Sequence, residues 1–218
     1  INRIEERGCS VLISESEEGR RKQPSPEDIV SRLAHIVNRD ESCRNVLLVV
    51  GGTETPIDDV RTISNRSTGR TGWMIADYLY RKGHQVCVLA GRLSFVPSTI
   101  CFPIIRSMDP AAMKCWIKDI IENDEMLIDS VVCAAAISDF VVSDSQSGKM
   151  TSGNDVVINL TPFEKILDKI PGWLSSKGRG NGHIIGFKLL SGSNEEELVN
   201  AARKQIERSG VSAVVAND

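Results

Sequence analysis

The sequence predicts an α/β protein with a doubly wound, mostly parallel, Rossmann-like sheet. Apolar runs of strand length alternate along the chain with stretches whose apolar residues recur at helical spacing. The run 46–50 is continuous and rich in β-branched residues, as in a strand buried on both faces. Small residues follow several of these runs, as expected where strands of such a sheet end at a ligand site.

The composition indicates one α/β domain with an appendage. The chain has 218 residues, 41% of them hydrophobic, and a net charge of −3, which argues against broad nucleic-acid binding. No apolar run reaches membrane-spanning length. The six cysteines have no metal-type close spacing and the three histidines are scattered. We therefore expect free thiols, a cytoplasmic location and no metal site made by side chains.

We expect residues 1–44 to form a tail or linker rather than part of the sheet. The charged run 14–22 is typical of a solvated loop. Ser25 is expected to cap a helix whose first residue is Pro26. The apolar face of this helix would consist of Ile29, Val30, Leu33, Ile36 and Val37.

Strands and helices alternate from residue 45 onward. We expect strands at 46–50, 85–90, 104–106, 129–136, 183–190 and 211–216, and helices at 73–80, 110–121 and 194–209. The Ser- and Gly-rich stretch 143–153 predicts a flexible loop, and 155–160 a short strand after it, together an insertion over the site. Pro162 is expected to open a further helix.

An anion site is predicted between the first strand of the sheet and its helix. A Gly-Gly-Thr turn, 51–53, follows the strand, and a second small-residue cluster, 67–72, leads into the helix. Backbone N–H groups of such a turn and of a helix N-terminus favour phosphate. Hydroxyls and positive charge come from Ser67, Thr68, Arg61, Arg66 and Arg70. The alternative is an ordinary turn with exposed arginines.

Small or polar residues also follow three other predicted strands. Because the carboxyl ends of parallel strands converge, Gly51, Gly52, Thr53, Ala134, Ala135, Ala136, Asp139, Phe187, Lys188 and Asn217 should lie together. Phe187 offers a stacking face, Asp139 accepts from amino or hydroxyl groups, and Lys149 adds charge from the loop. Taken singly, these three are more typical of a core, a turn and a solvated loop residue.

Several nucleotide motifs are absent. The chain lacks the P-loop pattern and the Gly-x-Gly-x-x-Gly pattern, and no histidine accompanies a serine elbow. A Rossmann reductase survives only as an NADP-dependent alternative, since the second strand ends in Ala90-Gly91-Arg92. A non-catalytic nucleotide-binding module is the other alternative.

One long signature resembles the phosphopantothenoylcysteine synthetase family. It comprises 51–53, 56–61, 63–69 and Gly72, and continues with 135–140, Lys149, Pro162, 186–189 and 215–218. The resemblance covers about 45–218. It implies ligation of L-cysteine to 4′-phosphopantothenate through an acyl-nucleotidylate in coenzyme A biosynthesis. It further implies CTP or ATP with Mg²⁺, and a homodimer.

The resemblance also implies roles for individual residues. Asn65, Lys149 and Arg61 would be catalytic, with Asn65 holding the acyl-nucleotidylate and Lys149 reaching the phosphates. Phosphopantothenate would be bound by Asn65, Ser67, Thr68 and Gly69. The nucleotide would be bound by Gly51, Gly52, Thr53, Ala134, Ala135, Ala136, Asp139, Lys149, Pro162, Phe163, Phe187, Lys188 and Asn217.

The sequence departs from the family at two places. Gln205 and Ser209 stand where many bacterial members carry two lysines for the triphosphate, so Lys188 or Lys204 would supply that charge. CTP is favoured and ATP stays open. Family members run on beyond residue 218, so we expect 45–218 to lack its C-terminal end. Residues 17–30 resemble the tail of the flavin-dependent phosphopantothenoylcysteine decarboxylase, so 1–44 is expected to be a remnant without that activity, or a mere linker helix.

Overall fold

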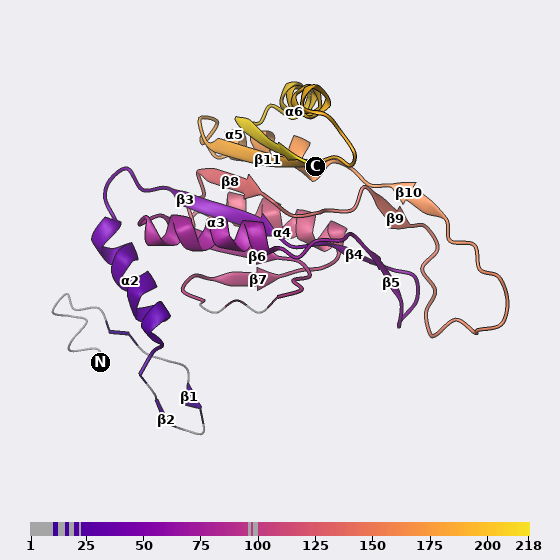
Figure 1. The fold of residues 1–218 in the computed structure, drawn as a ribbon, viewed down its shortest axis with the longest axis horizontal. Helices are drawn as coiled ribbons and strands as arrows, with labels where there is room; N and C mark the ends of the chain where they lie inside the picture. The colour runs from indigo at the N-terminus through magenta and orange to yellow at the C-terminus, as the bar shows by residue number, and fades with distance from the viewer. Residues whose placement is uncertain (1–10, 13–15, 18–19, 22, 96, 98–99) are drawn as a thin grey trace.

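A six-stranded parallel sheet forms the centre of the protein (Figure 1). The computed structural model describes residues 11–12, 16–17, 20–21, 23–95, 97 and 100–218. The strand order is β12-β11-β8-β3-β6-β7. These strands are β3 (Asn45–Val50), β6 (Gln85–Ala90), β7 (Ile104–Arg106), β8 (Ser130–Cys133), β11 (His183–Leu189) and β12 (Ala213–Asn217). Chain order reverses between β3 and β8, which makes the sheet doubly wound, as predicted.

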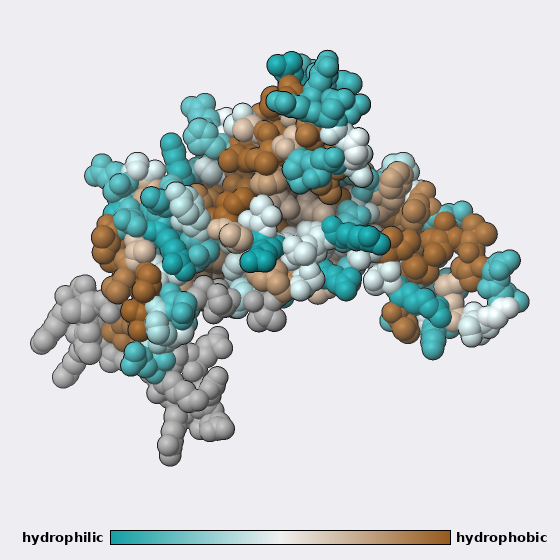
Figure 2. All heavy atoms as spheres, viewed as in Figure 1, coloured by the Kyte–Doolittle hydropathy of each residue, from teal (hydrophilic) through white to brown (hydrophobic). Residues whose placement is uncertain are grey.

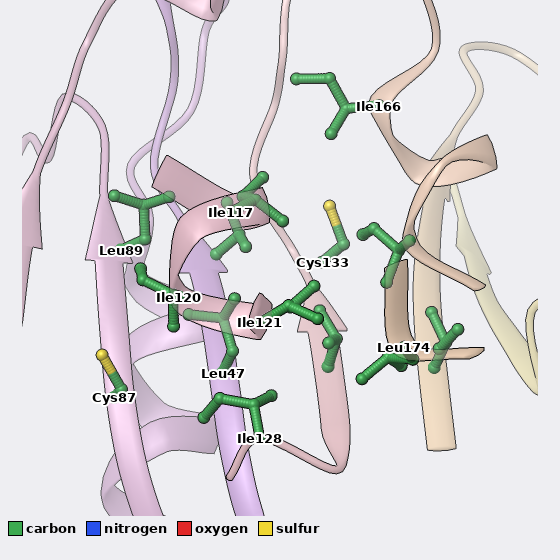
Figure 3. Close-up of a cluster of buried hydrophobic side chains, with 14 of the residues drawn as sticks. Leu47, Cys87, Leu89, Ile117, Ile120, Ile121, Ile128, Cys133, Ile166 and Leu174 are labelled. Atoms are coloured by element: carbon green, nitrogen blue, oxygen red, sulfur yellow. The ribbon is translucent and has the colours of Figure 1, made fainter. Parts of the chain in front are cut away.

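Helices cover both faces of the sheet. They are α3 (Arg70–Arg81), α4 (Pro110–Glu122), α5 (Ile170–Ser176) and α6 (Glu195–Ser209), with a 3₁₀ turn η1 at Ile166–Asp168. In β3, Leu47 and Val49 point into the cluster beneath α4 and α5, part of which Figure 3 shows. Leu48 and Val50 point into the opposite cluster, beneath α3. The continuous apolar run is thus explained by burial on both faces.

Side-chain caps fix where two of these helices begin. The Asp109 carboxylate accepts a hydrogen bond from the Ala112 N–H at 2.7 Å. Asn194 and Glu197 form a reciprocal capping box at the start of α6. Each cap satisfies backbone donors that have no partner inside the helix. These caps confirm the helix starts expected near 110 and 194.

The N-terminal helix α2 (Pro26–Asn38) starts where predicted but faces the other way. Ser25 caps it by accepting from the Asp28 N–H. Ser31 and His35 are buried against α3, where the His35 ring stacks on Tyr80 with centroids 4.2 Å apart. The predicted apolar face lies on the surface except for half-buried Ile29, and Val37 is 78% exposed. Within the predicted loop 14–22, two-residue strands β1 (Ser16–Glu17) and β2 (Arg20–Arg21) pair.

Two antiparallel hairpins leave the end of the sheet. One pairs β4 (Glu54–Pro56) with β5 (Thr62–Ser64), inside a stretch for which no strand was predicted. The other pairs β9 (Phe140–Val142) with β10 (Leu160–Pro162). We call residues 140–162 the arm (Figure 1).

The arm corrects two predictions. Residues 155–159 form no strand, because β10 begins only at Leu160, where it can pair with β9. Pro162 ends that strand instead of opening a helix, a place that tolerates its missing N–H because β10 is an edge strand. The Phe163 N–H then bonds to the Asp139 carbonyl at 2.8 Å, and helical structure starts at Ile166.

Candidate functional site

A pocket of about 810 Å³ opens at the carboxyl ends of β8, β11 and β12. It lies beside the point between β3 and β8 where the strand order reverses, the usual ligand position in this class of sheet. Its size suits a small ligand or a pair of them. One wall is made by 65–72, which lead into α3, and another by 133–139, which follow β8.

The start of α3 presents unpaired backbone donors to this pocket. The first intrahelical bond runs from the Trp73 N–H to the Gly69 carbonyl. The N–H groups of Gly69 and Arg70 bond to the Ser67 and Thr68 hydroxyls, each at 3.2 Å. No acceptor lies within bonding distance of the Thr71 N–H in the described part of the chain. A positive helix end with open donors favours an anion.

Glycines let the chain pass close to the sheet here. Gly51 has a φ of 84°, and a Cβ on it would lie 2.5 Å from the Arg92 carbonyl oxygen. A Cβ on Gly72 would lie 2.5 Å from a Val50 methyl, so α3 could not approach β3 with any larger residue. The predicted Gly-rich turn therefore shapes the site through close packing.

Gly51, Gly52 and Thr53 lie behind the lining rather than in it. The Gly52 N–H donates to the Arg92 carbonyl at 3.0 Å. The buried Thr53 hydroxyl accepts from the Ser138 N–H at 2.8 Å. With these groups engaged in the protein's own bonds, their direct contact with a nucleotide stays a prediction.

Asn65, one of the predicted site residues, lines the pocket directly after β5. Its side-chain amide donates to the Ala136 carbonyl at 3.1 Å. This bond joins the hairpin to the loop after β8, so the amide stands between the two walls. Ser67, Thr68 and Gly69 line the same side.

The other side of the pocket brings together the residues predicted at the remaining strand ends. Ala134, Ala135, Ala136, Asp139, Phe187, Lys188 and Asn217 all line it. The small side chains of the alanines leave room for a base or ribose to approach the backbone. Asp139 is engaged in an ion pair with Lys165.

Besides Gly51, Gly52 and Thr53, four predicted residues are not brought to the pocket. Arg61 bonds instead to the Asp58 carboxylate at 2.6 Å. Lys149 is exposed in the arm, and no residue of the arm lines the pocket. Pro162 ends β10, and Phe163 packs against the core cluster beneath α4 and α5. Their roles stay predictions.

Positive charge dominates the lining. Its cationic side chains are Arg66, Arg70, Lys165, Lys188 and Arg208, against the two carboxylates Asp139 and Glu164. Glu164 is itself paired with Lys114, and the hydrogen bond from that lysine lowers the pKa of the Glu164 carboxyl. A concave surface with excess positive charge attracts anions such as phosphates.

Three polar or charged lining residues that sequence patterns did not predict as contributors to this site are Gln205, Arg208 and Lys165. Arg208 lies three residues after Gln205 on α6, so helical spacing places both on one face. Gln205 is buried and donates to the Phe187 carbonyl at 3.3 Å. Lys165 follows β10 closely. Lys204, the alternative source of charge, does not line the pocket, whereas Lys188 does.

We also searched the described residues for a reactive cysteine, a metal site and a membrane-spanning helix. Burial raises the pKa of the Cys133 thiol to about 11, which makes it a poor nucleophile although it lines the pocket. No three His, Cys, Asp or Glu side chains gather as a metal site in the part of the chain that the structure describes. Nor does that part hold a helix long and apolar enough to cross a membrane.

Comparison with protein families gives a match over most of the chain. The family described as "DNA/pantothenate metabolism flavoprotein C-terminal domain" matches residues 42–218. The bifunctional coenzyme A biosynthesis protein CoaBC of Thermococcus kodakarensis is 34% identical over 221 residues, which cover 100% of this chain and 52% of that protein. The chain thus spans about half the length of this curated relative.

Solved structures share the fold. The DNA/pantothenate metabolism flavoprotein from Streptococcus pneumoniae superposes with a TM-score of 0.69 at 25% identity, over 81% of this chain and 82% of that one. A Cab2 variant in complex with phosphopantothenate-cysteine has a TM-score of 0.63 at 20% identity, over 88% and 77%. At that identity the second likeness concerns the fold alone.

Proposed function

Because the chain belongs to the DNA/pantothenate metabolism flavoprotein C-terminal domain family, we propose that it ligates L-cysteine to 4′-phosphopantothenate in coenzyme A biosynthesis. The reaction would consume a nucleoside triphosphate. The observation that carries the proposal is the pocket, which joins an open helix N-terminus and five cations to a wall of small residues. A ligase that activates one anion with another needs both kinds of surface.

In the first step the phosphopantothenate carboxylate attacks the α-phosphorus of the nucleotide. A bond forms between a carboxylate oxygen and the α-phosphorus, the bond from that phosphorus to the oxygen bridging to the β-phosphate breaks, and pyrophosphate leaves with the electron pair. Two anions must approach each other, so neutralising charge is the main requirement. Lys188 and Arg208 would face the polyphosphate, and the start of α3 with Ser67 and Thr68 would hold the phosphate of phosphopantothenate.

In the second step the cysteine amine attacks the acyl carbon. A C–N bond forms, the nucleoside monophosphate leaves, and the amine loses a proton. Asn65 is suited to both steps because its amide donor lies between the two walls. It would exchange the Ala136 carbonyl for an oxygen of the acyl-nucleotidylate.

The nucleotide is proposed to be CTP, with ATP as the alternative. Phe187 would pack on the base, while Ala135 and Asp139 would face base and ribose. We propose that Mg²⁺ arrives on the nucleotide phosphates, since both carboxylates of the lining are already paired with lysines. We assign it no protein ligand.

We propose that the arm joins two copies of the chain into a homodimer in the cytoplasm. Apolar side chains gather on the arm in Figure 2. Val157 is 85% exposed, and Phe140, Val156 and Leu160 are exposed beside it. Such a patch on a narrow projection is typical of a protein interface. Equilibrium sedimentation would show a monomer if this is wrong.

The boundary between tail and synthetase domain is proposed at residues 44–45. The family match begins at 42, just after α2 ends at Asn38. The exposed apolar face of α2 supports its origin as part of a different domain, the decarboxylase-like remnant. Removal of residues 1–41 should leave nucleotide-dependent ligation intact.

A pyrophosphate-release assay tests the function. The protein is incubated with phosphopantothenate, cysteine, Mg²⁺ and either CTP or ATP, and the faster reaction identifies the nucleotide. Release that requires phosphopantothenate, followed by a product that requires cysteine, is the expected result. Tight nucleotide binding without release would favour a non-catalytic module and would overturn the proposal.

A further inference from the structure

The β4–β5 hairpin touches the arm at its tip as well as the pocket at its base. At the base lie Thr53 and Asn65, bonded to the loop after β8. The tip, residues 57–61, lies beside residues 146–150 of the arm, about 90 positions later in the sequence. One short hairpin therefore links the pocket wall to the loop that carries Lys149.

Two backbone contacts align the tip with the arm. The Gln146 N–H donates to the Ile57 carbonyl at 3.0 Å, and the Asp59 N–H donates to the Gly148 carbonyl at 3.3 Å. The Asp59 carboxylate accepts from the Gly148 N–H at 2.7 Å. These bonds fix the residue just before Lys149.

Asp58 fixes the residue just after Lys149. One of its oxygens closes its own turn by accepting from the N–H groups of Val60 and Arg61, at 2.8 and 2.6 Å. The other accepts from the Met150 N–H at 3.1 Å and from the Arg61 guanidinium at 2.6 Å. The Asp58 side chain is fully buried, although it sits at a hairpin tip.

The charge state of Asp58 suits this role. Burial alone would raise the pKa of its carboxyl, but the hydrogen bonds from Val60, Met150 and Arg61 and the charge of Arg61 lower the pKa to about 2. The carboxylate is therefore ionised throughout the range in which an enzyme works. Arg61 reaches it from the surface and also lies 3.5 Å from the Met150 carbonyl.

We propose that Asp58 is a positioning residue that, with Asp59, holds the loop around Lys149 for the first step of the reaction. The inference rests on the proposed function. When the backbone is held on both sides of Lys149, less conformational entropy is lost as this lysine binds phosphate. It also gives Arg61 a part in the site through Asp58, although Arg61 does not line the pocket.

Asp58→Asn tests the proposal because the change is nearly isosteric. With the amide oxygen kept on the turn, the amide nitrogen would face the Met150 N–H, a donor against a donor. Asp59→Asn removes the charge of the carboxylate that accepts from the Gly148 N–H. Because Asp59 is exposed, this variant replaces Asp58→Asn in the test if that one fails to fold. Asp155→Asn, in the exposed part of the same loop, is the matched control.

Two measurements are made on the full chain. Hydrogen exchange at Gly148 and Met150 should become at least tenfold faster in Asp58→Asn, and remain unchanged in Asp155→Asn. The kcat for pyrophosphate release should fall tenfold or more, because misplacing a group by about 1 Å costs up to about 100-fold. The KM for cysteine, which enters later, should not change.

The outcomes separate the two proposals. Unchanged exchange overturns the contact, and faster exchange with an unchanged kcat overturns the positioning role. A change in the KM for cysteine equal to that in kcat would show general damage and would also count against it. If the unmodified chain itself releases no pyrophosphate, the proposed function fails, while the exchange measurement still decides whether Asp58 holds the loop.

Discussion

The pocket wall and the arm are built in opposite ways. The wall is anchored in the parallel sheet, with β8 buried along its whole length and β3 buried from Val46 to Val50. The arm is a two-stranded ribbon, and all the residues from 151 to 162 are exposed. The wall carries small residues and backbone groups, whereas the arm carries a single predicted catalytic lysine.

This difference separates how each region contributes to chemistry. The wall is rigid because its backbone is hydrogen-bonded into a sheet with a core on each face, so it can hold a ligand in one orientation. The arm has no core of its own and depends on the hairpin tip for its position. Substitutions in the wall should alter the rate of the chemical steps or the stability of the fold. Substitutions in the arm should alter the fraction of molecules in which Lys149 is in position.

The largest effect is expected in the wall. Asn65→Ala should lower kcat about 100-fold to 1,000-fold, because it removes a positioned donor for the developing charge. Pyrophosphate release and product formation would be measured separately. Asn200→Ala, on the exposed face of α6, is the control. A full rate in Asn65→Ala would remove this residue from the proposed mechanism.

The arm comes next. Lys149→Ala should slow pyrophosphate release about tenfold to 100-fold, the usual cost of losing a hydrogen bond between charged groups. Its thermal stability should match that of the unaltered chain, since Lys149 is exposed. Lys118→Ala, on the surface of α4, controls for the loss of a lysine. An unchanged rate would make Lys149 an ordinary solvated residue.

A stability measurement contrasts close packing with open surface. Gly72→Ala should lower the free energy of unfolding by about 1–3 kcal/mol, because the added methyl group meets Val50 at 2.5 Å. Gly172→Ala is the matched change, since nothing lies within 4 Å of its added Cβ in α5. It should be neutral or stabilising by up to about 1 kcal/mol. Equal melting temperatures would contradict the tight α3–β3 contact.

The smallest effect is expected from Arg208. Arg208→Gln should raise the KM for the nucleotide about tenfold with little change in kcat, because the side chain would add binding charge away from the reacting atoms. Its ion pair with Asp168, at 3.0 Å, keeps it partly engaged already. Arg203→Gln on the same helix is the control. If both variants bind equally well, Arg208 adds nothing to affinity.

Much of the sheet and its edge was predictable from local patterns. Apolar runs identified every strand of the central sheet, and Asp109 and Asn194 identified helix starts, because both signals depend on residues near in sequence. The convergence of Ala135, Phe187 and Asn217 also followed, since parallel strands all end at one edge.

Local sequence patterns failed for elements whose position depends on pairing or packing with another element. The strand at 155–160 was misplaced because β10 is defined by pairing with β9, about 20 residues earlier. The β4–β5 hairpin was missed for a different reason, since each of its strands has only 3 residues, too few to show an alternating pattern. On α2, the pattern indicated an amphipathic helix but not which face would pack on α3.

The sequence by itself determined the fold class, the Gly-rich turn and the set of groups available to bind an anion, because periodicity and residue type carry that information. Only the tertiary structure decided which groups share a pocket. It placed Arg208 and Lys165 in the lining, moved Arg61 to Asp58, and joined the loop of Lys149 to the hairpin that ends in Asn65. Apart from Arg61 and Asp58, which are three residues apart in one hairpin turn, these contacts connect residues far apart in the chain, and their geometry is set by packing rather than by local preference.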